Sequence, residues 1–228
     1  MPLPEPMAKP VFHLVYLLIR RMEGAKIPPI RRRVTPVGES RKQAFDHMLD
    51  AALAGDSRIP IDYSLLYPKS EFLNYVCDWR GFVAHGSPLH DLEVLQPIRK
   101  SSDKSEFGQR RQIFCSPDAM WAMWFAILDK DKFNLTRNGS VRVGRGERRV
   151  KYYHFELPKI NEVNRPFAEG TIYIARAGDF PDKRPYPILD WFDGEIEEWG
   201  SSGPVKPLAR MRVSPQDFPY LDKIQFCL

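Results

Sequence analysis

The stretch Gly81–His90, GFVAHGSPLH, ends an apolar run on a histidine, a glycine and a serine. The run predicts a short β-strand, and it stops at His85 because Gly86 permits backbone conformations that other residues avoid. An imidazole both donates and accepts hydrogen bonds near neutral pH. The strand end is therefore either an ordinary turn with a structural histidine or the rim of a binding crevice.

A second group of chemically capable residues is acidic and lies late in the chain. The segment GEIEEWG contains Glu195, Glu197 and Glu198 directly before a tryptophan. Surface carboxylates are common, so one interpretation is an exposed acidic turn that balances a basic surface. The alternative is that one of these acids stabilises positive charge in a reaction.

Several well-defined catalytic motifs are absent from the sequence. It has no GxxxxGK[ST], GxGxxG, HExxH or GxSxG pattern, which argues against phosphate-loop hydrolases, Rossmann enzymes, zincins and α/β-hydrolases. His85, His90 and Asp91 lie close together but lack further ligands at a recognisable spacing. The sequence therefore predicts no metal site.

Composition indicates a soluble globular protein with a basic surface. The chain has 228 residues, 43% hydrophobic content, a formal charge of +5 and a pI near 9.1. This content fills a real core, and the charge either favours acidic partners such as nucleic acid or nucleotides or is simply solvated. Three cysteines show no CxxC spacing and do not predict a disulfide scaffold.

The longest apolar run, Val11–Ile19, is too short to span a membrane and predicts a core strand or helix. It is followed by Arg20 and Arg21 rather than a small-residue cleavage site, so it is a poor secretory signal. We expect no membrane partner and a reducing, cytoplasmic compartment, either in the producing cell or in a cell that the protein enters.

We expect two parts, an N-terminal helical and extended segment (residues 1–75) and a second domain (residues 76–228). In the first part, the basic connector KIPPIRRRVTPVGES predicts an extended surface linker. The next segment predicts an amphipathic helix that Ser40 caps and Gly55 stops. Its apolar residues recur at helical spacing: Phe45, Met48, Leu49, Ala52 and Leu53.

The second part contains mostly short strands. They are expected in DWRGFVAHGS, RRQIFCS, GTIYIARAGDF and PLARMRVSP, and in a hairpin formed by SVRV and RRVKYYHFEL through GRGE. SPDAMWAMWFAILD predicts a buried helix with Ser116 as cap and Pro117 in its first turn. The fold class is therefore α+β, with a mainly antiparallel sheet.

The order of these elements resembles the ADP-ribosyltransferase fold family, in particular its rifampin ADP-ribosyltransferase and poly(ADP-ribose) polymerase members. The likeness spans residues 82–213 and rests on HGS, the L-x-P of LEVLQP, IFCSPDAMWAMWFA and GEIEEWGSSGPV. It implies two small, mainly antiparallel sheets with a crevice for NAD, which is a substrate, and no metal.

The resemblance assigns roles to the residues above. Family members use an acid on a late strand to stabilise the oxocarbenium-like transition state of nicotinamide release. Glu198 is the best match, although Glu195 and Glu197 form a Glu-x-Glu pair that arginine-modifying members use. His85 would hydrogen-bond a ribose hydroxyl, Gly86 would admit the carboxamide, and Ser87 would add a contact.

Aromatic residues would sandwich the nicotinamide. Family members commonly have a stacking tyrosine on the second strand, where this chain has Phe114, which keeps the ring but loses the hydroxyl. Phe125, on the following helix, is the candidate for the other side of the ring, although aromatic residues in such a helix are usually core.

The resemblance implies transfer of ADP-ribose from NAD to a protein or nucleic-acid acceptor, as in a toxin, effector or defence enzyme. Two alternatives remain open: an NAD glycohydrolase, in which water attacks, and a non-catalytic nucleic-acid-binding module. An arginine-rich hairpin with Tyr152 and Tyr153 is either a solvated basic surface or the place where a nucleic acid or the NAD pyrophosphate would bind. Its arginines are Arg137, Arg142, Arg145, Arg148 and Arg149. The acceptor and the oligomeric state are not encoded in any visible motif.

Overall fold

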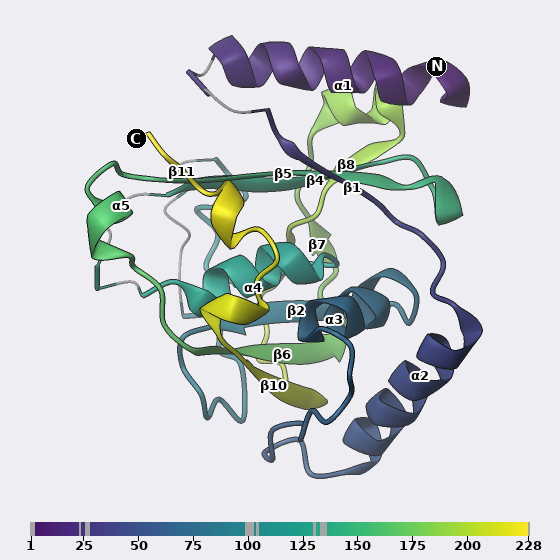
Figure 1. Cartoon of the computed structure of the whole chain (residues 1–228), viewed down its shortest axis with the longest axis vertical. Coiled ribbons are helices and arrows are strands. Elements are labelled where there is room, and N and C mark those ends of the chain that lie inside the picture. The colour runs from purple at the N-terminus through teal and green to yellow at the C-terminus, as the bar shows by residue number, and fades with distance from the viewer. Residues whose placement is uncertain are drawn as a thin grey trace.

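Helix α4 (Ala119–Ile127) lies between two mainly antiparallel sheets, and the other elements are arranged around it (Figure 1). The computed structural model describes residues 3–22, 24–25, 28–98, 103, 105–129, 131–132 and 136–227. Helices and small, mainly antiparallel sheets make up the described fold, which confirms the α+β class. Among these residues, no helix combines the length and the apolar character needed to cross a bilayer.

The first sheet lies above α4 in Figure 1, and helix α1 (Glu5–Met22) covers its other face. Its strands are, in order across the sheet, β1 (Ile30–Arg33), β5 (Val150–Leu157), β4 (Arg137–Val143) and β8 (Gly194–Ile196), with the short β11 (Gln225–Phe226) parallel to β5. The predicted hairpin is confirmed as the antiparallel pair β4–β5. Phe12 of α1 packs edge-on against Tyr152 of β5, with ring centroids 5.2 Å apart.

The second sheet lies below α4 and has the order β10 (Ala209–Val213), β6 (Gly170–Arg176) and β2 (Phe82–Ser87). Two glycines set the distance between this sheet and α4. A Cβ on Gly86 would lie 1.8 Å from the carbonyl oxygen of Ala122, and one on Gly170 would lie 1.9 Å from that of Ala126. The helix backbone therefore rests directly on these two strands.

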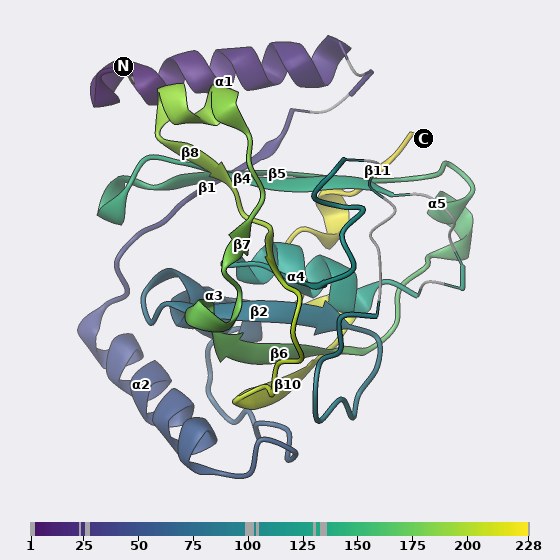
Figure 2. The same ribbon diagram turned by 180° about the vertical axis from the view of Figure 1, so that it is seen from behind.

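The third sheet consists of β3 (Ile113–Cys115), β9 (Trp199–Ser201) and β7 (Asp182–Lys183), and Figure 2 shows β7 between the other two sheets. Within the described ranges, one bridge joins the third sheet to the second sheet, in which Ala84 and Ser116 exchange backbone hydrogen bonds of 2.8 and 2.9 Å. The β2, β3 and β9 strands are therefore neighbours.

The N-terminal residues contribute to the same layers as the rest of the chain. Four residues of β1 pair with β5, so part of the connector expected on the surface is instead a paired strand. Helices α2 (Glu39–Ala54) and α3 (Lys69–Asp78) bury Phe45 and Phe72 in the main core. Six short segments complete the described elements: α5 (Asn161–Asn164), Gly146–Arg148, Ala177–Asp179, Pro187–Phe192, Pro215–Asp217 and Leu221–Lys223.

Two predicted helix caps are wrong, although both helices exist. Helix α2 begins at Glu39 after Gly38, so Ser40 lies inside its first turn, whereas Gly55 ends the helix as predicted. At α4 the cap is Asp118, whose side chain accepts a 2.8 Å hydrogen bond from the Trp121 backbone. The Ser116 hydroxyl instead accepts a hydrogen bond from the Asp118 backbone N–H and donates one to the carbonyl oxygen of Glu197.

Candidate functional site

The ring of His85 lies where β2 and β3 separate. Beyond the Ala84–Ser116 bridge, the His85 Nδ1 atom is 2.7 Å from the carbonyl oxygen of Phe114, so a side chain takes the place of a ladder bond. Because a carbonyl oxygen accepts only, Nδ1 carries the proton. The interaction fixes the ring between the two strands, and we name this region, with Gly86, Phe114 and Glu198, the strand gap.

Gly86 and Ser87 follow His85, and their immediate roles are structural. Gly86 is the point at which the backbone of α4 meets β2, so the missing side chain already has a packing reason. Ser87 is buried, and its hydroxyl accepts a 3.1 Å hydrogen bond from the Leu89 backbone in the turn that follows the strand. These contacts account for the sequence HGS without a ligand.

The two phenylalanines lie in different surroundings. Phe114 is half-buried on β3, and its ring contacts Phe107 edge-on with centroids 5.9 Å apart. Phe125 is half-buried on α4 and contacts Trp121 at 6.3 Å. The structure thus links His85 and Phe114 directly, whereas Phe125 belongs to the helix layer.

Glu198 directly precedes β9, the strand that pairs with β3. Phe114 pairs with Gly200, and because side chains alternate along a strand, Glu198 continues the face that Phe114 occupies. Its Oε2 atom is 2.7 Å from Nη1 of Arg184, whose Nη2 atom is 2.5 Å from Asp103. Burial raises the pKa of Glu198, and the opposite charge of Arg184 limits that rise.

The neighbouring acids point the other way and are each committed to partners. Glu195 accepts from Trp199 at 2.5 Å and pairs with Arg142 at 2.8 Å. Glu197 is buried, with one oxygen 2.8 Å from Lys151 and the other 2.8 Å from the Ser140 hydroxyl. Of the three acids, Glu198 alone lies on the face of Phe114.

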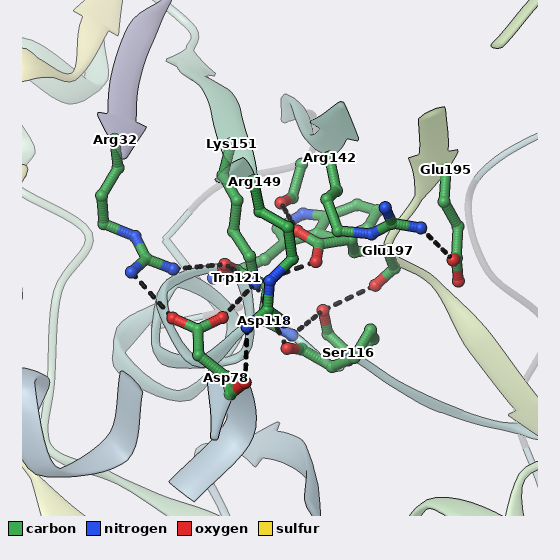
Figure 3. Close-up of polar contacts among 12 residues, drawn as sticks. Arg32, Asp78, Ser116, Asp118, Trp121, Arg142, Arg149, Lys151, Glu195 and Glu197 are labelled. Carbon is green, nitrogen blue, oxygen red and sulfur yellow. Dashed lines mark hydrogen bonds and ion pairs between the residues drawn. The ribbon is translucent and has the colours of Figure 1, made fainter. Parts of the chain in front are cut away.

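Glu197 belongs to a buried ion cluster, which we define as Arg32, Asp78, Asp118, Lys151 and Glu197 (Figure 3). Lys151 is 1% exposed, and its Nζ atom lies 2.8 Å from Asp78, 3.0 Å from Asp118 and 2.8 Å from Glu197. Arg32 adds contacts of 2.8 Å to Asp78 and 3.5 Å to Asp118. The cluster joins β1, α3, the start of α4, β5 and the segment before β9.

Burial and ion pairing shift the pKa values of the cluster in opposite directions. Desolvation lowers the pKa of Lys151, but its three carboxylate neighbours outweigh this and hold it above its ordinary value. Burial disfavours the charge of Asp78, yet Lys151 and Arg32 keep its pKa below its ordinary value. For Glu197, burial is the largest effect and raises the pKa to about 7, with Lys151 opposing it.

The hairpin expected to stack nucleic-acid bases does not offer its tyrosines. Tyr152 and Tyr153 are both 0% exposed, so the prediction that they stack bases is wrong. Tyr152 packs under α1, and the Tyr153 hydroxyl donates a 2.7 Å hydrogen bond to Asp118. Both lie in β5, a strand that is covered on each face. The arginines around the turn suggest an exposed hairpin and give no sign of this burial.

Among the described residues, no group of three or more His, Cys, Asp or Glu side chains is arranged to hold a metal ion. His90, considered as a ligand from the sequence, instead places its Nδ1 atom 3.1 Å from the Thr171 hydroxyl. No protein-family model, curated protein or solved structure matches the chain. A function for it therefore rests on its residues and their geometry.

Proposed function

We propose that this chain is an NAD-dependent ADP-ribosyltransferase and that the strand gap is its NAD crevice. The observation that carries the proposal is the adjacency of three strands that lie far apart in sequence. The side chain of His85 on β2 bonds the backbone of Phe114 on β3, Glu198 directly precedes the strand that pairs with β3, and the family resemblance gives each of these residues a role. The same adjacency supports an ADP-ribosyltransferase-like arrangement of the sheets.

The reaction follows from the chemistry of these groups. His85 anchors the ribose next to nicotinamide, and the Phe114 ring stacks on the nicotinamide. As the bond between C1 of the ribose and the nicotinamide nitrogen breaks, nicotinamide leaves with the electron pair and positive charge develops on the sugar. The Glu198 carboxylate stabilises that charge, and a nucleophile of the acceptor then bonds to C1 and loses its proton.

Arg184 is the positioning residue in this mechanism. It contacts Glu198 through both its backbone, whose N–H donates to the Glu198 carbonyl at 3.0 Å, and its guanidinium group. These two contacts fix the direction of the carboxylate and favour its charged form, which burial disfavours. Only the charged form stabilises a developing cation.

The test is nicotinamide release from NAD by the full chain, measured by chromatography, with label from NAD followed onto protein and nucleic-acid acceptors. We expect Glu198→Gln to lower release by at least about 100-fold, the range seen when one electrostatic stabiliser is removed. Glu195→Gln is the matched control, because Glu195 faces Arg142 and Trp199 instead of the gap.

The distribution of label separates the alternatives. Label on an acceptor supports transfer, and release into water alone indicates a glycohydrolase that uses the same residues. Equal release by wild type and Glu198→Gln would refute the assignment of the acid. No release and no NAD binding under any condition would refute the proposed function.

A further inference from the structure

A cavity of about 280 Å³ lies between α1, the edge of β4 and the segment from Arg184 to Ile196. Figure 2 shows this region, where α1 passes over the short helix Pro187–Phe192 and β8. The volume is near the lower end of the range for small-molecule sites, about 300–1,000 Å³. His85, Gly86, Phe114 and Glu198 do not line it.

The part of β4 that β8 does not reach forms one wall of this cavity. Strand β8 ends at Ile196, which pairs with Val141, so the β4 residues from Arg137 to Gly139 extend past the end of β8. These residues line the cavity. Gly139 packs closely against His154, since a Cβ there would lie 2.6 Å from the ring of His154.

Aromatic rings line the same space from both sides of the sheet. Trp121 approaches from α4 and Tyr16 from α1. The Trp121 indole donates to the Asn138 side chain at 2.6 Å, and the Tyr16 hydroxyl lies 2.9 Å from His154 Nδ1. Because their polar ends have partners in the protein, these side chains offer the cavity their apolar ring surfaces.

The charged side chains that line the cavity are arginines. Arg20, Arg137 and Arg184 line it, whereas none of the described lining residues is Asp or Glu. These arginines are ion-paired with Glu156, Glu198 and Asp103, which do not line the cavity. Burial lowers the pKa of His154 to about 3, so its ring is a neutral member of the wall at neutral pH.

We propose that this cavity binds a small aromatic anion, a flat ring that carries a phosphate or a carboxylate group. Rings stack on the aromatic wall, and planar guanidinium groups bind such anions through paired hydrogen bonds. The cavity is separate from the strand gap, which it approaches through Arg184. The inference does not rest on the proposed function.

Calorimetric titration of the full chain tests this with four probes: AMP, benzoate, adenosine and inorganic phosphate. We expect AMP, benzoate or both to bind, and to bind at least about tenfold more tightly than adenosine and phosphate, which lack the charge and the ring respectively. Binding of AMP alone assigns a phosphate ligand, and binding of benzoate alone assigns a carboxylate. No binding of either, or equal binding of AMP and adenosine, would overturn the proposal.

Two matched pairs of variants locate the binding. Val15→Trp fills the cavity from α1, whereas Leu18→Trp adds the same ring on the outer face of that helix, where Leu18 is 54% exposed. Arg137→Gln removes a lining cation, whereas Arg145→Gln removes an exposed one at the turn. We expect the first member of each pair to weaken binding at least about tenfold and the second to leave it unchanged.

The location is refuted if anion binding survives both Val15→Trp and Arg137→Gln, as it would if AMP occupied the strand gap instead. Thermal unfolding of each variant identifies any that does not fold, and Arg137→Lys, which keeps the charge, should then retain more binding than Arg137→Gln. The binding titration does not depend on nicotinamide release, so a negative result in it can be told apart from a negative result in the test of the proposed function.

Discussion

The buried ion cluster and the strand gap meet at the peptide between Glu197 and Glu198, and the two acids have opposite surroundings. Glu197 faces Lys151 and Ser140 in a cluster assembled from five segments. Glu198 faces one cation, Arg184, beside two strands that share a single bridge among the described residues. Glu197 and Glu198 are adjacent in sequence, yet the first is fixed by contacts inside the cluster and the second is held mainly by Arg184.

This difference bears on how acids with raised pKa values are interpreted. Burial raises the pKa of both Glu197 and Glu198, so the direction of the shift does not identify a site. The two acids differ in the partners of their carboxylate oxygens and in the face on which they lie. Both oxygens of Glu197 are engaged inside the core, which indicates a structural role, whereas Glu198 lies on the face that carries Phe114.

The largest effect should come from removing the cation at the centre of the cluster. Lys151→Met leaves three buried carboxylates with Arg32, and losing one partner of a buried ion pair costs about 3–5 kcal/mol. Lys132→Met is the matched control, because Lys132 is half-exposed and pairs with Asp129 at the surface. Urea unfolding measures both, and equal midpoints would show that the cluster does not stabilise the fold.

The next effect is a pH dependence that belongs to Glu197. Its pKa is about 7 in the folded protein and ordinary, near 4.5, in the unfolded chain, so the folded state binds more protons between these values. The stability contributed by this group is therefore complete below about pH 4.5 and is lost as the pH rises to about 7. The slope is at most about 1.4 kcal/mol per pH unit.

Glu197→Gln removes the titrating carboxyl group. The other ionisable groups of the cluster are the same in the variant and in the wild type, so their titration cancels in the comparison. We expect the variant to gain stability relative to wild type as the pH rises from 5 to 7, and the difference to level off above pH 7. Urea unfolding at several pH values measures it. A constant difference across this range would show that Glu197 is ionised in the folded protein throughout.

The sequence reveals the strand gap more readily than the cluster. His85, Gly86 and Ser87 are consecutive, so strand periodicity and turn chemistry locate them together. The hairpin, the buried helix and the α+β class follow from the same local rules and are confirmed. The roles of Phe114, Phe125 and Glu198 in binding NAD stay predictions.

The cluster escapes local rules because its members are spread over the chain: Arg32, Asp78, Asp118, Lys151 and Glu197. One signal was present. Lys151 interrupts the run VKYYHF, and a cation in a strand that is apolar on both faces requires buried acidic partners. Which acids they are depends on how α3, α4 and β9 pack, and that is a property of the tertiary fold.

The smallest of these effects tests why Gly86 is a glycine. Gly86→Ala would place a methyl group 1.8 Å from the Ala122 carbonyl, so α4 must shift away from β2. Overpacking of this kind costs about 1–3 kcal/mol. Gly178→Ala is the matched control, since a Cβ there meets nothing within 4 Å and the backbone is not left-handed. Thermal unfolding should show a lower midpoint for Gly86→Ala alone.

The same variant then separates the two explanations of the sequence HGS. If Gly86 is required for the packing of α4, Gly86→Ala lowers stability, and any NAD affinity changes only as far as the strand moves. If Gly86 is required for the approach of a ligand, NAD affinity falls while the midpoint stays equal to that of Gly178→Ala. The contact with Ala122 favours the first outcome, because the space that a side chain would need is already filled by the helix backbone.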